Sequence, residues 1–409
     1  MPVRDLTAQD FVTYKTMSAG AFGGSFDPSS ATARQDFSPG ETAIGIDASG
    51  LPGGLDGVLA AGARIRHDQI TLGGGLVGCG GVAGLVVHPA HRGDGLFRTL
   101  LTAVIARCDA ESLPVSMLYP SHPALYRRYG YQVVARGQSL IVPLVELQRI
   151  PAVPDRRLVP VTAATMPRLR RLYHRLSAGD NAMLRREPPL FAEGLPGAGW
   201  SALLLQDGSG TDHGYLSWTR HGQDPRGVGL DVHELMGHTR SDRLALLRSL
   251  GSWSTVTELV RLRVRTEDPV LDVLPGAGTR PSPEPVPLVM MRVIDTAATL
   301  RARRAPEQLG GRIRLVVEDG TVPAGTCRAA GTFLVSADSG TIAAEPESAG
   351  AEVLGTVRLD IHAASLLLMG GRSLADARRL DLTAAADPAA ETFLDALLAG
   401  PRPSVMDAF

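Results

Sequence analysis

Apolar runs separated by glycine, proline or polar turns recur along the chain, and several follow one another closely between residues 76 and 119. Residues 76–87 are almost wholly apolar or glycine, which predicts a buried strand whose glycines mark a bulge or a close backbone approach. Residues 96–108 repeat apolar side chains at helical spacing, and 113–119 is a short run of strand type. The order strand, loop, helix, strand predicts a parallel or mixed sheet and an α/β fold.

The remainder of the chain repeats this pattern less clearly. Further predicted strands occupy residues 200–205, 214–218, 232–235, 288–294, 312–317 and 331–335. Predicted helices occupy residues 242–250, 361–369 and 387–398, with Ser241 as the N-cap of the first and Gly370–Gly371 closing the second.

Two proline-rich stretches, 150–160 and 275–287, predict linkers, because proline fixes φ and lacks a backbone donor. They divide the chain into parts of roughly 1–145, 146–287 and 288–409. A length of 409 residues suits two or three domains. The second stretch is also compatible with a surface loop inside a domain.

Composition narrows the class of protein. The chain is 44% hydrophobic and 20% charged, which is typical of a globular protein. Its formal net charge of -1 offers no basic surface for nucleic acid. Three scattered cysteines, an N-terminus without a signal-peptide pattern, and no apolar stretch long enough for a membrane span favour a reduced, cytoplasmic protein.

The loop before the predicted helix at 96–108 is the strongest candidate for a binding site. Arg92-Gly93-Asp94-Gly95 opens that helix, and unpaired N–H groups at a helix N-terminus suit a pyrophosphate. Arg92 and Arg98 add positive charge, and the preceding strand offers backbone groups to an amide-containing chain such as pantetheine. An ordinary turn before a helix has the same composition, and neither the Rossmann nor the P-loop pattern is present.

Residues 82–98 resemble motif A of the GNAT N-acetyltransferase superfamily, in which Arg92-x-x-Gly95 keeps the usual pattern and Phe97 replaces the last small residue. Together with the segment Tyr119–Tyr131, this resembles the Eis (enhanced intracellular survival) family of acetyltransferases. The resemblance covers the whole chain. It implies tandem GNAT-like domains with mixed central sheets, the second without cofactor, followed by a C-terminal sterol-carrier-like α/β domain.

The resemblance also implies acetyl-CoA as acetyl donor, aminoglycoside amines as acceptors at several positions, and a homohexamer. Tyr126 matches the general acid of the family, and Phe409 matches a terminal residue whose carboxylate enters the active site. The expected acetyl-CoA contacts are Leu85, Val86, Val87, Arg92, Gly93, Asp94, Gly95, Leu96, Phe97, Arg98, Ser121 and His122.

The chemistry of acetyl transfer fits these two groups. A tyrosine is protonated at neutral pH and can donate to the departing thiolate, although a tyrosine in this segment is also compatible with a core or surface position. A free carboxylate is a weak base that desolvation or a bridging water would help, unless the chain end is disordered. Asp27, Asp36 and Asp407 are candidate partners for a polycationic substrate.

Three functional alternatives remain open from sequence. The leading prediction is the small-molecule N-acetyltransferase; a second is acetylation of protein lysines or polyamines; a third is a non-enzymatic lipid-binding or scaffold protein. No metal site is predicted, because His233 and His238 lack the i, i+4 spacing of a zinc-binding helix. His88 and His91 are interpreted as polar loop residues.

Overall fold

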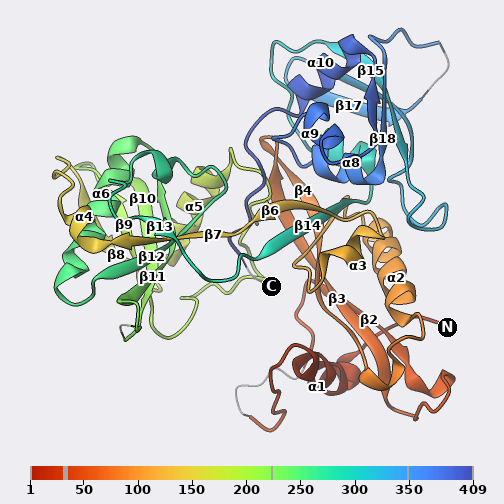
Figure 1. Cartoon of the computed structure of the whole chain (residues 1–409), viewed down its shortest axis with the longest axis horizontal. Coiled ribbons are helices and arrows are strands. Elements are labelled where there is room, and N and C mark those ends of the chain that lie inside the picture. Colours follow the sequence, from red (N-terminus) through yellow and green to blue (C-terminus); the bar gives the residue numbers. More distant parts are fainter. Residues whose placement is uncertain (1, 31–35, 223, 348–349, 408–409) are drawn as a thin grey trace. The chain divides into compact units, whose positions relative to one another are not determined.

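The computed structural model describes residues 2–30, 36–222, 224–347 and 350–407, which form two compact units (Figure 1). The first unit contains the chain up to Val134 together with Val289–Gly400. The second contains Ala135–Leu288 and the tail that begins at Pro401. Each unit is a mixed α/β structure, which confirms the predicted fold class.

The first sheet of unit 1 has seven strands in the order β1-β2-β3-β4-β5-β14-β6. Their bounds are β1 Arg4–Asp5, β2 Glu41–Asp47, β3 Leu59–Leu72, β4 Gly75–Val87, β5 Val115–Leu118, β14 Leu288–Val293 and β6 Gln132–Arg136. The helices α1 Phe11–Ala21, α2 Leu96–Ala110 and α3 Pro123–Arg127 accompany this sheet (Figure 1). β4 and β5 are parallel, and the pairs β1–β2, β2–β3, β3–β4 and β5–β14 are antiparallel.

Helix α2 packs its apolar face on β2, β3 and β4, as its helical spacing predicts. Leu100, Leu101 and Val104 are fully buried there. A Cβ placed on Gly80 of β4 would lie 2.5 Å from the sulfur of Cys108 on α2. The glycines of β4 therefore allow the close backbone approach that the sequence indicated.

β14 comes from the distant third part of the sequence and pairs with β5, with Met290 opposite Leu118 and Arg292 opposite Ser116. Unit 1 also holds a five-stranded sheet in the order β17-β16-β15-β18-β19. Its strands are β15 Gly311–Glu318, β16 Gly331–Asp338, β17 Thr341–Pro346, β18 Thr356–Asp360 and β19 Ala384–Ala386. The helices of this part are α7 Thr296–Arg301, α8 Ile361–Leu367, α9 Leu374–Arg378 and α10 Pro388–Leu397.

Unit 2 contains a second seven-stranded sheet, ordered β13-β7-β12-β11-β10-β9-β8. Its strands are β7 Gln138–Pro143, β8 Arg157–Pro160, β9 Trp200–Gln206, β10 Asp212–Arg220, β11 Val228–Gly237, β12 Leu259–Val264 and β13 Arg280–Pro281. Its helices are α4 Leu144–Gln148, α5 Met166–Ser177 and α6 Arg240–Gly251. Short 3-10 turns occur at Ala8–Asp10, Ala48–Gly50, Pro89–His91, Ser252–Thr255 and Pro269–Asp272.

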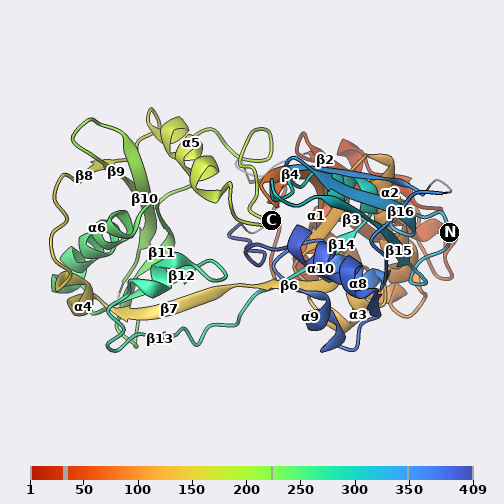
Figure 2. The ribbon, with the colours of Figure 1, turned by 90° about the horizontal axis from the view of Figure 1, so that it is seen from above.

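Figure 2 shows α5 and α6 on opposite faces of the unit 2 sheet. Alternating side chains explain this arrangement, since successive residues of a strand face opposite sides. Leu204 belongs to the core that contains α5, and its neighbour Leu205 belongs to the core that contains α6.

Two local predictions need correction. The stretch 150–160 is not wholly a linker, because β8 pairs with β9 and places Val159 opposite Leu204. Proline is tolerated there because β8 is an edge strand. The N-cap of α6 is Thr239, whose hydroxyl accepts from the backbone N–H of Asp242, and Ser241 lies inside the helix.

The chain passes from the first seven-stranded sheet to the second between β6 and β7, and it returns to the first sheet at β14. The first and third parts of the sequence therefore share one unit. The division of the chain into separate domains at residues 145 and 287 stays a prediction. Within the described residues, every helix is too short or too polar to cross a bilayer.

Candidate functional site

The loop between β4 and α2 leaves the N-terminus of α2 open. Gly95 is the N-cap residue with φ +80°, and Gly93 has φ +100°, conformations that favour glycine. Within this described segment no side chain caps the helix and no acidic residue occupies its first turn. The first N–H groups of α2 are therefore available to an anionic ligand.

A cavity of about 920 Å³ lies against this helix terminus. It is lined by the end of α1, the end of β4, the loop, and α3 with its flanking residues. The lining residues are Ala21, Phe22, Leu85, Val86, Val87, His91, Arg92, Gly93, Gly95, Leu96, Phe97, Arg98, Ser121, Leu125, Tyr126, Arg128, Tyr129 and Thr321. The structure thus brings together most of the residues that the sequence predicted for a cofactor site.

Three predicted residues stand apart from this lining. The carboxylate of Asp94 lies 3.8 Å from Nδ1 of His91 and is half exposed. His122 is the exposed N-cap residue of α3. Phe409 lies outside the described residues.

The charge of the cavity is positive. Arg92, Arg98 and Arg128 line it, and among its described lining residues there is no aspartate or glutamate. Three guanidinium groups beside an open helix N-terminus suit a ligand that carries several phosphates.

The end of β4 offers backbone groups to the same ligand. In the described pairing, β4 runs beside β5 only from Cys79 to Val82, and Leu85–Val87 extend beyond that register. Gly84 has φ +58°, and the buried Tyr14 hydroxyl donates to its carbonyl at 2.9 Å, which holds the strand in this divergent course. An amide-bearing ligand can therefore pair with the strand edge that β5 leaves.

His91 is a lining residue that the sequence interpretation missed. It is 5% exposed, and its Nδ1 is buried without a hydrogen-bond partner among the described residues. A buried nitrogen without a partner costs free energy, and a ligand group in the cavity would relieve that cost. The only sequence signal that His91 lines the cavity was its position beside Arg92 in the loop.

Tyr126 lies on α3 with its ring packed edge-on against Phe97 at a centroid distance of 5.6 Å. It is 6% exposed, and it lines the cavity together with Ser121. Burial raises the pKa of the Tyr126 hydroxyl, and a hydrogen bond with Ser121 lowers it in part. Tyr126 therefore holds its proton at neutral pH and can act as a proton donor.

Other lining residues were also missed. Phe22, at the end of α1, and Leu125 and Arg128, next to Tyr126, lacked a distinguishing pattern. Thr321 comes from the loop between β15 and β16, about two hundred residues away in sequence, so no local signal could have identified it.

In unit 2, the helix N-terminus that follows the equivalent strand is capped by side chains of the protein itself. β11 leads into α6, whose N-terminal groups bind Asp242: its carboxylate accepts from the backbone N–H of Thr239 at 2.9 Å and from the Thr239 hydroxyl at 2.6 Å. Arg156 donates to the other oxygen of Asp242 at 2.7 Å. A carboxylate at this position repels an incoming phosphate, so the site does not suit a nucleotide.

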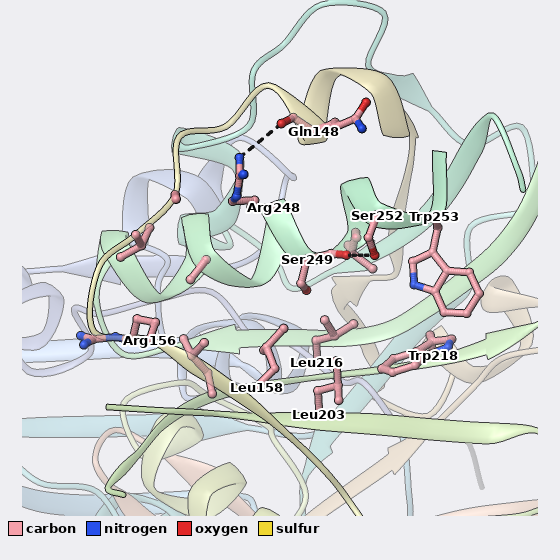
Figure 3. Close-up of a pocket in the computed structure, with 15 residues that line it drawn as sticks. Gln148, Arg156, Leu158, Leu203, Leu216, Trp218, Arg248, Ser249, Ser252 and Trp253 are labelled. Atoms are coloured by element: carbon pink, nitrogen blue, oxygen red, sulfur yellow. Dashed lines mark hydrogen bonds between the residues drawn. The ribbon is translucent and has the colours of Figure 1, made fainter. Parts of the chain in front are cut away.

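Unit 2 does contain a cavity of about 710 Å³, which Figure 3 shows in close-up. It lies beside Ser249 of α6 and Ser252 of the 3-10 turn that follows, and over leucines of β9 and β10. Trp218 and Trp253 form one wall, with ring centroids 6.2 Å apart. This mainly apolar cavity is thus a different feature from the phosphate-type site of unit 1.

The predicted acidic partners and the histidine pair take other positions. Asp27 and Asp36 are exposed, and Asp27 accepts hydrogen bonds from Ser29. Asp407 binds Arg186 within unit 2 at 2.9 Å. His233 shares a hydrogen bond with Thr219 at 2.7 Å, and the part of the chain that the structure describes has no cluster of three His, Cys, Asp or Glu that could hold a metal.

Comparison with protein families gives three matches. Residues 2–134 match an acetyltransferase (GNAT) domain family, and residues 182–293 match a second acetyltransferase (GNAT) domain family. Residues 296–406 match the sterol carrier protein domain family. An uncharacterised N-acetyltransferase of Streptomyces coelicolor is 26% identical over 311 residues, which cover 70% of this chain and 71% of that protein.

Several solved structures share the fold over the whole chain. A GCN5-related N-acetyltransferase from Anabaena variabilis is 19% identical with a TM-score of 0.82, and 100% of each chain is covered. One from Kribbella flavida is 22% identical with a TM-score of 0.78, covering 100% of this chain and 98% of the other. Eis1 from Mycobacterium abscessus is 19% identical with a TM-score of 0.71 and 100% coverage of both.

The chain is therefore an N-acetyltransferase with tandem GNAT domains and a C-terminal sterol-carrier-like domain, and its acetyl donor is acetyl-CoA. The site of unit 1 fits that donor. The open α2 terminus and three arginines suit the phosphates, and the end of β4 suits the pantetheine amides. The buried His91 nitrogen, which has no hydrogen-bond partner among the described residues, adds a polar group that a ligand can satisfy.

Proposed function

We propose that this protein acetylates amines of polycationic small molecules such as aminoglycosides, at more than one position. The observation that carries the proposal is Tyr126, a buried proton donor in a positively charged cavity at an open helix terminus. The sequence resemblance of residues 119–131 to the Eis family supports this choice of substrate. By the same resemblance we propose a homohexameric assembly, which light scattering would test.

The residues of the site suggest how transfer proceeds. Arg92 and Arg98, with the N–H groups of α2, hold the phosphates of acetyl-CoA, and Leu85–Val87 pair with its amides. The neutral amine attacks the thioester carbonyl, a C–N bond forms, and the C–S bond breaks. Tyr126 donates its proton to the departing sulfur, because CoA leaves more readily as the neutral thiol than as the thiolate.

A proton must also leave the attacking nitrogen. We propose that the carboxylate of Phe409 accepts it, directly or through water, and attracts the positively charged substrate. The tail that leads toward Phe409 is anchored in unit 2, where Thr266 donates to Ser404 at 2.8 Å and Arg186 binds Asp407.

Variants of two kinds distinguish the contribution of the Phe409 carboxylate from that of its ring. Deleting Phe409, or adding one glycine after it, moves the carboxylate and should lower turnover strongly. Phe409→Leu keeps the carboxylate in place and should retain most of the activity. Equal activity in all three variants would reject the role of the carboxylate.

The substrate is tested by thiol release from acetyl-CoA with aminoglycosides, polyamines and lysine peptides, and by counting acetyl groups with mass spectrometry. We expect the highest kcat/KM and several acetyl groups per molecule with an aminoglycoside. A preference for a lysine peptide or a polyamine would contradict the aminoglycoside as substrate, while the acetyltransferase activity would stand. Binding of a lipid without any acetyl transfer would favour the scaffold alternative.

A further inference from the structure

Arg292 is completely buried although it carries a permanent positive charge. It lies on β14, within the seven-stranded sheet of unit 1, opposite Ser116 of β5. A buried guanidinium is costly unless it is paired and hydrogen-bonded, so its partners indicate what the charge is for.

Two partners that accept through oxygen come from the sterol-carrier-like domain, as does the sulfur of Cys327, 3.7 Å from Nη2 of Arg292. Arg292 forms an ion pair with Asp319, whose side chain is 3% exposed, and donates to the Thr321 hydroxyl at 3.0 Å. Asp319 in turn accepts from the backbone N–H of Thr321 at 2.9 Å and from its hydroxyl at 2.6 Å. Arg292, Asp319 and Thr321 form one connected cluster, and Thr321 also lines the cavity proposed for acetyl-CoA.

The third oxygen acceptor belongs to the GNAT domain. Arg292 donates to the carbonyl of Tyr129, and the N–H of Tyr129 donates to the carbonyl of Tyr126 at 2.9 Å. Gly130, with φ +77°, makes room for this contact, because a Cβ there would lie 1.9 Å from Nη1 of Arg292. The guanidinium therefore occupies the space beside the turn that follows Tyr126.

We propose that Arg292, held by Asp319 and Thr321, is a positioning residue that fixes Tyr126 against the acetyl donor. Helix α3 spans only Pro123–Arg127, and a helix of five residues has little stability of its own. Its end must be held by other parts of the fold, and Arg292 provides that attachment. The sterol-carrier-like domain thereby helps to hold the proton donor in place, which is a role additional to the proposed function and dependent on it.

Three variants test the proposal: Arg292→Met, Arg292→Lys and Gly130→Ala. Arg292→Met and Gly130→Ala should each lower kcat by about tenfold or more, because displacement of a catalytic group by about 1 Å can cost about 100-fold. The dissociation constant for CoA, measured by calorimetry, should change by less than about threefold because the loop 92–98 is untouched. Arg292→Lys should recover only part of kcat, because an ammonium cannot form the forked set of contacts.

A pH profile separates positioning from general stability. If the segment loosens, solvent reaches Tyr126 and its pKa falls, so the alkaline loss of kcat should move to lower pH in Arg292→Met. Arg303→Met is the matched control, since Arg303 is 3% exposed in the same unit, donates to Leu368 at 3.0 Å and is not a lining residue. It should lower the melting temperature while kcat and the pH profile stay as in the wild type.

The outcomes distinguish this proposal from the proposed function. A wild-type protein that neither binds nor consumes acetyl-CoA would overturn the function itself. An active wild type with Arg292→Met indistinguishable from Arg303→Met in kcat, CoA affinity and pH profile would overturn the positioning role alone.

Discussion

Burial raises the pKa of the Tyr126 hydroxyl, which lines the cavity that we propose for acetyl-CoA. The pKa of this group lies above its ordinary value of about 10, so its ability to donate a proton does not decline between pH 7 and 9. The rate should therefore rise over this range as the substrate amine loses its proton, and fall only at more alkaline pH.

Replacing Tyr126 by phenylalanine should reduce kcat by about 100-fold or more, the usual contribution of a positioned acid. The dissociation constant for CoA should change little, because the ring still packs against Phe97. Tyr131→Phe is the control: its hydroxyl bonds to Ser116 at 2.8 Å, and it is not a lining residue. Equal kcat in Tyr126→Phe and Tyr131→Phe would contradict the role of Tyr126.

His174 should make unit 2 sensitive to acid. Burial, together with Arg185, lowers the pKa of His174 to about 4, and its Nε2 accepts from the backbone N–H of Arg186 at 3.1 Å. Since the folded pKa is below the unfolded value of about 6.5, stability is full above pH 6.5 and is lost as pH falls toward 4.

The His174→Gln variant keeps an acceptor and cannot take up this proton. Its melting temperature should therefore fall less than that of the wild type between pH 7 and pH 4.5, as measured by calorimetry. An identical pH dependence in both proteins would show that His174 does not contribute.

At the scale of single elements, α6 offers a test of capping. Thr239→Ala removes the hydroxyl that accepts from Asp242 and should cost about 1 kcal/mol of unfolding free energy. Ser241→Ala changes a neighbouring exposed serine inside the helix and should have almost no effect. Chemical denaturation of both variants measures the difference, and a larger loss for Ser241→Ala would contradict the observed cap.

Elements with a strong local pattern could be predicted from the sequence. The strand, loop and helix at 76–108 were identified because their spacing, their glycines and the charge of Arg92 are all local signals. The pairing of β14 with β5 could not be predicted, since it joins residues about 170 positions apart. The same separation concealed Thr321 as part of the site, and the short strand β8 was missed because its prolines indicated a linker.

At the scale of the whole molecule, the order of domains along the chain differs from the grouping of residues in space. Unit 1 combines the first GNAT domain with the sterol-carrier-like domain, and Arg292 is buried where the two share contacts. The tail from Pro401 returns to unit 2, where Asn181 donates to the Pro401 carbonyl at 2.7 Å. Truncation of the sterol-carrier-like domain should therefore remove Asp319 and Thr321 from the active unit and abolish turnover.

The N-terminus of α2 is open and that of α6 is closed. We therefore expect the stability of the two units to respond differently to the concentration of coenzyme. A ligand that binds only the folded state stabilises it by mass action, by about 2.7 kcal/mol at one hundred times its dissociation constant. Hydrogen exchange with and without CoA should show added protection at residues 85–98 and none at 237–242, and equal protection at both would contradict this difference. Because Asp242 acts as a permanent internal ligand for α6, we expect the coenzyme concentration to raise the stability of unit 1 and to leave that of unit 2 unchanged.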